Sequence, residues 1–298
     1  VVATSEVPTT ADDYLAMAKA SQAKKGREQS VIRASNQSLK LRPTGEGYFL
    51  RAYAKHDLKD YQEAIADLDK AIDINPQLAA AYYNRGNAKD DLGDYQGAIA
   101  DLSKAIEIHP QLADAYSNRG RAKGKLGDYQ GAIADFNKAI DINPQLAVAY
   151  YNRGNAKGEL GDKQGAIADY SKAIEINPLY ALAYYNRGNT KGKDLGDLYG
   201  AIADYNKTLK IDPQHADAFN NRGNAKDELG DKQGAIADFN RAIEINPQYS
   251  FAYHNRGVVK GKLGDYQGMC LDFKKGSSLG NQEAINVLLE LKPTGVCR

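Results

Sequence analysis

Residues 147–180 read AVAYYNRGNAKGELGDKQGAIADYSKAIEINPLY. The stretch predicts two short helices, the first over about Val148–Leu160 and the second over about Lys163–Ile176. We expect Gly161 and Asp162 to form the turn between them, with Asp162 capping the second helix. Pro178 predicts the end of the unit, because proline cannot continue a helix and disfavours helical geometry in the residue before it. Neither helix can bury its apolar face alone, so the stretch requires neighbouring copies.

The chain contains these copies. The prolines that close the units mark the period: Pro76, Pro110, Pro144, Pro178, Pro213 and Pro247. The spacing is 34 residues except for one interval of 35, whose extra residue lies within 191–200. We interpret it as a tolerated insertion at the turn between the two helices of the fifth unit; a local contact site is the alternative. The predicted units are residues 45–78, 79–112, 113–146, 147–180, 181–215, 216–249 and 250–283.

The two ends of the chain differ from these units. Residues 1–10 predict a flexible lead-in, and residues 11–44 predict a degenerate helical pair that is rich in lysine and arginine. This basic segment is interpreted either as the solvated outer face of an end unit or as a patch for an acidic partner or anionic lipid. Residues 284–298 predict a capping helix, over Ala284–Leu291, followed by a tail.

The composition argues against several classes of function. The chain has 39 basic and 38 acidic residues, a net charge of +1, which does not favour nucleic-acid binding. No apolar run approaches the ~20 residues of a membrane helix. The two cysteines fit neither a disulfide framework nor a metal site: Cys270 is expected to be a small buried side chain and Cys297 an exposed thiol. The first residue, Val1, is compatible with removal of an upstream signal or anchor; we expect a cytoplasmic or peripherally membrane-associated protein.

Small and large apolar positions recur once per unit. Tyr82, Gly86, Gly93, Ala98, Ala105 and Pro110, with their counterparts in the other units, resemble the signature of the tetratricopeptide repeat (TPR) family. The resemblance covers 45–283 strongly and 11–44 weakly, and the closely similar NRGNAK-type units also resemble arrays of photosynthetic bacteria. It implies an all-α, right-handed superhelix, an α-solenoid of helix-turn-helix repeats, whose first helices line a concave groove. Independently of the family, the recurring glycines and alanines predict places where helices cross closely.

Catalysis has little support in the sequence. There is no glycine-rich phosphate loop, metal-spaced His/Cys set or nucleophile elbow, so we expect neither an enzyme nor a cofactor. The periodic Arg85 and Asp101 series is interpreted as a structural ladder of charge pairs. The more regular Tyr82 series is interpreted as core.

The candidate binding residues form two asparagine series one helical turn apart on the first helices. The first is Asn84, Asn118, Asn152, Asn186, Asn221 and Asn255. The second is Asn87, Asn155, Asn189 and Asn224, interrupted by Arg121. Asparagine is only a fair helix former, and its amide both donates and accepts hydrogen bonds. We expect the rows to hold the backbone of an extended peptide in the groove; capping of groups between repeats, or recent duplication of one unit, are the alternatives.

Tyr83, Tyr151 and Tyr185 lie beside the first asparagine series and are candidates for packing on the ligand or on the neighbouring helix. Chaperone-binding TPR domains hold a C-terminal carboxylate with lysine and arginine, but Phe49 and its counterparts stand where the first clamp lysine would be. A neutral or extended segment is therefore the better candidate ligand. The predicted function is a scaffold or adaptor for proteins; the alternative is a peripheral assembly or tethering factor for a membrane-bound enzyme or complex, such as a photosynthetic one.

Overall fold

The computed structural model describes residues 8–22, 24, 26–292 and 295–297. Over these residues the chain is all-α, with no strand, and it divides into two compact units, residues 1–156 and 157–298. The first unit contains α1 (Ala11–Gln22), α2 (Glu28–Leu41), α3 (Gly45–Asp57), α4 (Tyr61–Ile74), α5 (Ala79–Asp91), α6 (Tyr95–Ile108), α7 (Ala113–Lys125) and α8 (Tyr129–Ile142). The boundary between the units falls within α9 (Ala147–Glu159).

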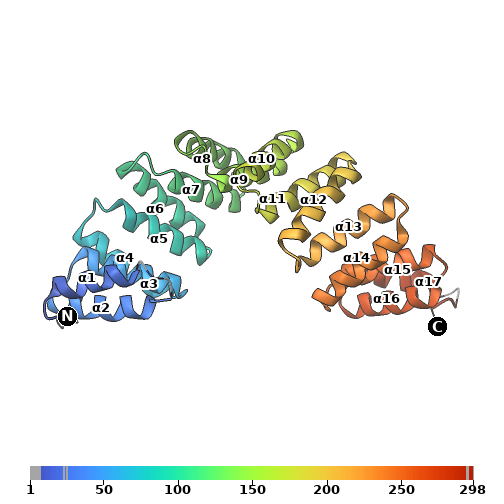
Figure 1. Ribbon diagram of the computed structural model, residues 1–298, viewed down its shortest axis with the longest axis horizontal. Coiled ribbons are helices and arrows are strands. Elements are labelled where there is room, and N and C mark those ends of the chain that lie inside the picture. Colours follow the sequence, from blue (N-terminus) through green and yellow to red (C-terminus); the bar gives the residue numbers. More distant parts are fainter. Residues whose placement is uncertain (1–7, 23, 25, 293–294, 298) are drawn as a thin grey trace, which may run out of the picture. The chain divides into compact units, whose positions relative to one another are not determined.

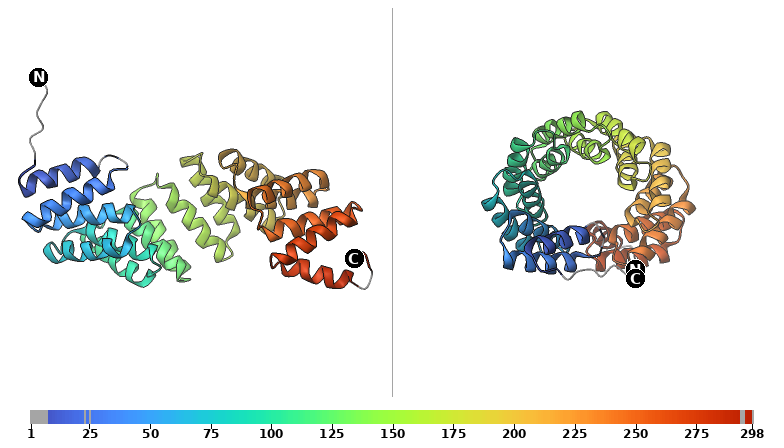
Figure 2. Two further views of the ribbon diagram at one scale, coloured as in Figure 1. Left: turned by 90° about the horizontal axis from the view of Figure 1, so that it is seen from below. Right: turned by 60° about the vertical axis from the view of Figure 1, so that its left-hand side comes forward.

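The second unit continues in the same manner. Its helices are α10 (Lys163–Ile176), α11 (Ala181–Asn189), α12 (Leu198–Ile211), α13 (Ala216–Glu228), α14 (Lys232–Ile245), α15 (Ser250–Lys262), α16 (Tyr266–Ser278) and α17 (Gln282–Leu291). Within each unit, successive helices pack in antiparallel pairs and the pairs stack on one another (Figures 1 and 2). The predicted fold class, an α-solenoid, is confirmed. The helices predicted within 147–180 correspond to α9 and α10.

The turn within each pair follows from two residue types. The glycine of each Gly-Asp turn has a positive φ, for example 85° at Gly161, a conformation that costs glycine no steric penalty. The following aspartate caps the next helix: the backbone N–H of Gly165 donates to Asp162 Oδ1 at 2.9 Å. The same cap recurs at Asp94, Asp128, Asp197, Asp231 and Asp265. Each cap satisfies an N–H group that the first turn of a helix leaves free.

The recurring glycines lie where the two helices of a pair cross. A Cβ atom on Gly120 would lie 2.9 Å from Phe136 Cε1 and 3.1 Å from the carbonyl oxygen of Ala132. A Cβ atom on Gly223 would lie 2.7 Å from Phe239. These positions have no room for a side chain, which confirms the predicted close crossings there. Around them, alanine and aromatic side chains such as Ala132, Phe136 and Phe239 form the core.

The extra residue of the fifth unit was predicted to lie in the turn between the two helices. The structure places it instead in the helix before that turn. Residues Thr190–Asp194 form a π-helical turn at the end of α11. A π turn absorbs one added residue by shifting the hydrogen bonds from i→i+4 to i→i+5. The Gly196-Asp197 turn and its cap on Gly200 are thereby kept.

The degenerate first pair forms a small core of its own. Leu15 and Ala18 of α1 pack against Val31 and Ala34 of α2, and the cluster extends to Leu50 of α3. The first pair therefore joins the stack. Residues 1–7 of the predicted lead-in lie outside the described residues.

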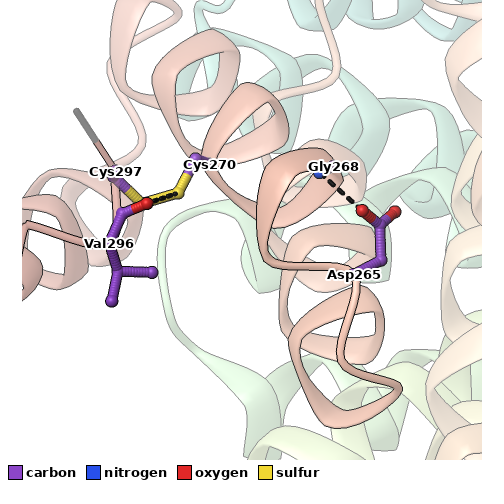
Figure 3. The surroundings of a disulfide bond; sticks show 5 residues. All are labelled: Asp265, Gly268, Cys270, Val296 and Cys297. Carbon is purple, nitrogen blue, oxygen red and sulfur yellow. Dashed lines mark hydrogen bonds between the residues drawn. A yellow bond between two sulfur atoms is a disulfide. The ribbon is translucent and has the colours of Figure 1, made fainter.

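At the other end, the prediction for the cysteines is wrong. Cys270 of α16 and Cys297 of the tail form a disulfide, with their Cα atoms 5.2 Å apart (Figure 3). Cys270 is buried as expected, but Cys297 is not a free thiol. The two residues are 27 positions apart in the chain, and only packing of α17 onto α16 brings the tail back to Cys270. Val287, Leu288 and Leu291 of α17 pack on the same cluster, so the last helix covers the apolar face of the seventh pair.

In the part of the chain that the structure describes, no helix combines the length and the apolar character needed to cross a membrane.

Candidate peptide-binding face

The first helices of neighbouring pairs contact one another and form one face of each unit. In the first unit α3 contacts α1 and α5, and α5 contacts α7; in the second unit α13 contacts α15. The asparagine series lie on this face. We call it the first-helix face.

In the first unit one asparagine joins two repeats. Asn118 Nδ2 of α7 donates to Asn87 Oδ1 of α5 at 2.8 Å and lies 3.2 Å from the hydroxyl oxygen of Tyr83. Three predicted site residues thus meet in one contact. This link between repeats explains part of the recurrence of asparagine. It resembles the alternative in which the asparagines cap groups between repeats, but the partners are side chains rather than backbone groups.

The second unit repeats the link. Asn221 Nδ2 of α13 donates to Asn189 Oδ1 at 2.9 Å and lies 3.1 Å from the Tyr185 hydroxyl oxygen. Asn189 Oδ1 also accepts from the buried Tyr205 hydroxyl at 2.9 Å. The Tyr185 ring packs on His215 with centroids 4.5 Å apart, and burial raises the pKa of Tyr185. Tyr185 therefore packs between repeats, the second of the two roles considered for it.

In the link between α13 and α15, the acceptor is not a member of the second asparagine series. Asn255 Nδ2 of α15 donates to Asn220 Oδ1 at 3.0 Å. Asn220 and His254 occupy the position held by Tyr83 and Tyr185 elsewhere. His254 is buried against Phe273, and burial lowers its pKa.

Other members of the series keep their amides available. A pocket of about 300 Å³ lies between α3 and α5 and is lined by Ala52, Tyr53, His56, Asp57, Leu68, Tyr83, Asn84 and Asn87. Within the described residues the Asn84 amide has no hydrogen-bond partner. His56 Nε2 lies 2.9 Å from Asp91 Oδ2, which fixes its ring at the rim. Burial raises the pKa of Asp57, although the nearby His56 opposes this.

A smaller pocket in the second unit occupies the corresponding place. It has a volume of about 100 Å³ and is lined by Gly192, Lys193, Leu198, Ala201, Tyr205, Asn221, Asn224, Ala225 and Glu228. Asn221 and Asn224 correspond in the repeat to Asn84 and Asn87. Asn224 makes no hydrogen bond to any residue that the structure describes. Both units therefore present an unpaired asparagine amide in a pocket of the first-helix face.

Arg121 explains the interruption of the second series. Its guanidinium pairs with Asp90 of the preceding repeat at 2.7 Å. Asp90 is 7% exposed and its pKa is raised by burial, partly offset by Arg121. The sequence singled out Arg121 but not Asp90, because only two repeats have aspartate at the position of Asp90. The other is Asp227, which pairs with Lys262 at 2.6 Å.

The remaining candidates are half-buried on their helices. Tyr151, Asn152 and Asn155 lie on α9, and Asn186 lies on α11.

The arginine–aspartate series does not belong to the first-helix face. Arg85 donates through Nε and Nη2 to both carboxylate oxygens of Asp101, at 2.9 and 2.6 Å, and Lys89 reaches the same carboxylate at 2.8 Å. Arg85 also lies 5.4 Å from the ring centroid of Tyr82. The same arrangement recurs at Asp67, Asp135, Asp204, Asp238 and Asp272. These carboxylates are buried between paired cations, as expected for a structural ladder.

Comparison with known families agrees with the fold. The model described as "TPR repeat" matches residues 52–89, 120–161 and 193–230, and the model described as "Tetratricopeptide repeat" matches residues 79–112, 147–180 and 216–249. Together these matches cover more than half of the chain. The chain belongs to the tetratricopeptide repeat family.

Solved structures give the same result. A TPR protein from Parabacteroides merdae ATCC 43184 is 25% identical and covers 83% of this chain and 98% of its own, with a TM-score of 0.60. MamA is 30% identical over 54% of this chain and 94% of its own (TM-score 0.51). YrrB, described as a TPR protein with an unusual peptide-binding site, is 27% identical over 63% of this chain and 96% of its own (TM-score 0.52). No curated protein matches the chain.

Proposed function

We propose that this TPR protein is a scaffold that binds an extended, neutral peptide segment of another protein on its first-helix face. The observation that carries the proposal is the Asn84 amide, which lies unpaired in the pocket between α3 and α5. The peptide-binding site named for the similar protein YrrB supports it. The protein would act by binding rather than by catalysis.

The pocket suits a peptide because it combines two kinds of contact. The Asn84 amide supplies two donors and an acceptor, which match the C=O and N–H groups of a backbone without reading its side chains. Tyr53 and Tyr83 add aromatic surface, which gives contact area at low entropic cost. Asp57 disfavours an acidic ligand residue. Side-chain preference therefore comes from the pocket, while the amide holds the main chain.

The asparagine links between repeats support the same face. Asn118 and Asn221 fix the separation of successive first helices by their hydrogen bonds. A rigid face loses little freedom when a ligand binds, which favours affinity. In this proposal the linked asparagines position the face, and the unpaired Asn84 and Asn224 contact the ligand.

The alternative of a tethering factor for a membrane-bound complex remains a hypothesis. A tethering factor and a scaffold would use the same binding mechanism and would differ only in the partner protein. Identifying the partner therefore tests this alternative.

The experiment compares Asn84 with an asparagine that belongs to neither series. Peptides are selected from a phage-displayed random library on the wild-type protein, and their affinities are measured by fluorescence anisotropy. Asn84→Ala is expected to weaken binding about tenfold, equivalent to roughly 1.4 kcal/mol, without changing the melting temperature. Asn137→Ala is the control, because Asn137 contacts Arg153 away from the first-helix face.

Selected peptides that bind Asn84→Ala and the wild type equally would contradict the proposal. Circular dichroism of both variants excludes loss of helix as the cause of weaker binding.

A further inference from the structure

Another cavity lies away from the first-helix face, at the N-terminal end of the first unit. It has a volume of about 480 Å³ and is bounded by α2, α3 and α4, which are neighbours in the stack (Figure 1). Its lining residues are Arg33, Asn36, Gln37, Leu39, Lys40, Tyr48, Arg51 and Lys70. Four of the eight are basic and none is acidic. We call this cavity the α2–α4 groove.

Among the residues that the structure describes, only one of the four cations, Arg51, has an acidic partner. Arg51 donates to Asp67 through Nε at 2.8 Å and to Asn36 Oδ1 through Nη1 at 2.6 Å. Arg33 and Lys40 have no acidic partner among the described residues, and the Lys70 ammonium lies 5.3 Å from the ring centroid of Tyr48.

Other basic residues of the first pair behave differently. Lys19 pairs with Glu46, and Arg42 pairs with Asp12. Lys24 and Arg27 line a separate pocket together with Glu28 and Asp57. Arg33 and Lys40 are therefore the basic residues of the first pair that lie at the groove.

The later repeats provide an internal reference. Arg51 donates to Asn36 as Arg85 donates to Asp69, so Asn36 and Asp69 are equivalent positions. In this register Arg33 replaces an alanine that is present in six of the seven later second helices, the last of which has Leu271: Ala66, Ala100, Ala134, Ala168, Ala203 and Ala237.

Lys40 shows the same departure. In this register it replaces an acidic residue that is present in five of the seven later second helices: Asp73, Glu107, Asp141, Glu175 and Glu244, with Lys210 and Ser278 as the exceptions. The counterparts of Lys70 are also neutralised where these glutamates occur: Lys104 pairs with Glu107 and Arg241 pairs with Glu244. Arg33 and Lys40 thus place two cations where most of the later second helices have an alanine and a carboxylate.

A solvated end face would explain exposed charges of mixed sign, but not cations gathered around one cavity in place of alanine and carboxylate. We propose that the α2–α4 groove binds a multiply charged phosphate-type oxyanion. Arg33, Lys40 and Lys70 supply the positive charge, and guanidinium groups match phosphate oxygens in geometry. The free Nδ2 of Asn36 and the amide of Gln37 supply neutral donors. A phosphorylated lipid headgroup and a soluble phosphate compound share this chemistry.

The test uses inorganic pyrophosphate as the probe in isothermal titration calorimetry at low ionic strength, where screening is weak. Arg33→Ala with Lys40→Asp gives the first groove, at these two positions, the residues of the second one, Ala66 and Asp73. This double variant is expected to lower the affinity for pyrophosphate by at least about tenfold. Lys104→Ala changes the counterpart of Lys70 in the next groove and is expected to leave the affinity unchanged.

Two results would overturn the proposal: no heat of binding with the wild type, or equal affinity in the wild type and the double variant. Tighter binding of a polyglutamate peptide than of pyrophosphate would also overturn it, because it would indicate an acidic protein partner. Arg33 and Lys40 are both exposed, so circular dichroism of the double variant is expected to match the wild type.

Sedimentation with vesicles separates the two sources of phosphate. Vesicles of phosphatidylcholine with phosphatidylinositol bisphosphate are compared with phosphatidylcholine alone. Binding to the first that the double variant loses supports a lipid headgroup. Pyrophosphate binding without vesicle binding supports a soluble phosphate compound.

Discussion

Two series of polar residues recur once per repeat, and the structure gives them different roles. Each aspartate of the charge ladder, such as Asp101, is buried and paired with an arginine and a lysine of its own repeat. The asparagines are unequal: Asn118 is bonded to the preceding repeat, whereas Asn84 is unpaired in a pocket. Recurrence alone therefore does not distinguish a structural residue from a binding residue. What distinguishes them is whether the protein already satisfies the polar group.

The largest effect is expected at the charge ladder. Asp101→Ala leaves Arg85 and Lys89 without their carboxylate in a largely buried site, and removing one partner of a buried pair costs about 3 kcal/mol. Urea denaturation followed by circular dichroism measures the loss. A loss as small as that of an exposed pair would contradict the assignment of this series as structural.

A smaller effect is expected at the interruption of the asparagine series. Arg121→Asn restores the repeat's usual residue but removes the cation that faces Asp90, leaving a buried carboxylate without its charge partner. We expect a loss of about 2 kcal/mol near neutral pH.

This loss has a defined pH dependence. Burial raises the folded-state pKa of Asp90, so the folded state binds a proton more tightly than the unfolded one. Stability is therefore favoured at low pH and falls as the pH rises from the unfolded pKa through the folded pKa. Without Arg121 the folded-state pKa of Asp90 is expected to rise further. The stability that Arg121→Asn loses relative to the wild type is therefore expected to become smaller as the pH falls. A deficit independent of pH between neutrality and the acid range would show that Asp90 is not its cause.

Next in size is the link between repeats. Asn118→Ala removes the hydrogen bond to Asn87 and the contact with the Tyr83 hydroxyl, and a net loss of about 1 kcal/mol is expected. Thermal unfolding of this variant beside the wild type measures it. An unchanged melting temperature would show that the asparagine series does not join the repeats.

The smallest effect on stability is expected at Asn84. Asn84→Ala removes no internal hydrogen bond, and replacing asparagine by alanine within a helix favours the helix by a few tenths of a kcal/mol. We expect the melting temperature to stay the same or rise slightly while peptide binding falls. A clear loss of stability would move Asn84 into the structural group with Asn118.

Much of the fold could be predicted because it depends on local signals. Gly161 and Asp162 specify a turn and a cap through their own backbone and side chain, and Pro178 ends a helix by its ring. Gly120 could be recognised as a close crossing because its smallness recurs with the period. The two asparagine series could be placed on one side of each first helix because their members lie three residues apart within a unit.

The site could be predicted only in part, because partners lie in other repeats. Nothing local distinguishes Asn84 from Asn118, and only the neighbouring helix shows that one is bonded and the other unpaired. The π turn at Thr190–Asp194 was missed because one added residue does not reveal whether a helix or a turn absorbs it. The disulfide was missed because Cys297 approaches Cys270 only after α17 has folded back.

By itself, the sequence determined the helices, their caps, the period and the family, since these follow from side chains close together in the chain. Tertiary structure decided which polar groups are satisfied, where the cysteines meet, and that Arg33, Lys40 and Lys70 surround one cavity. Hydrogen bonds, disulfides and charge clusters depend on distances between residues remote in the chain, and only packing of the repeats sets those distances.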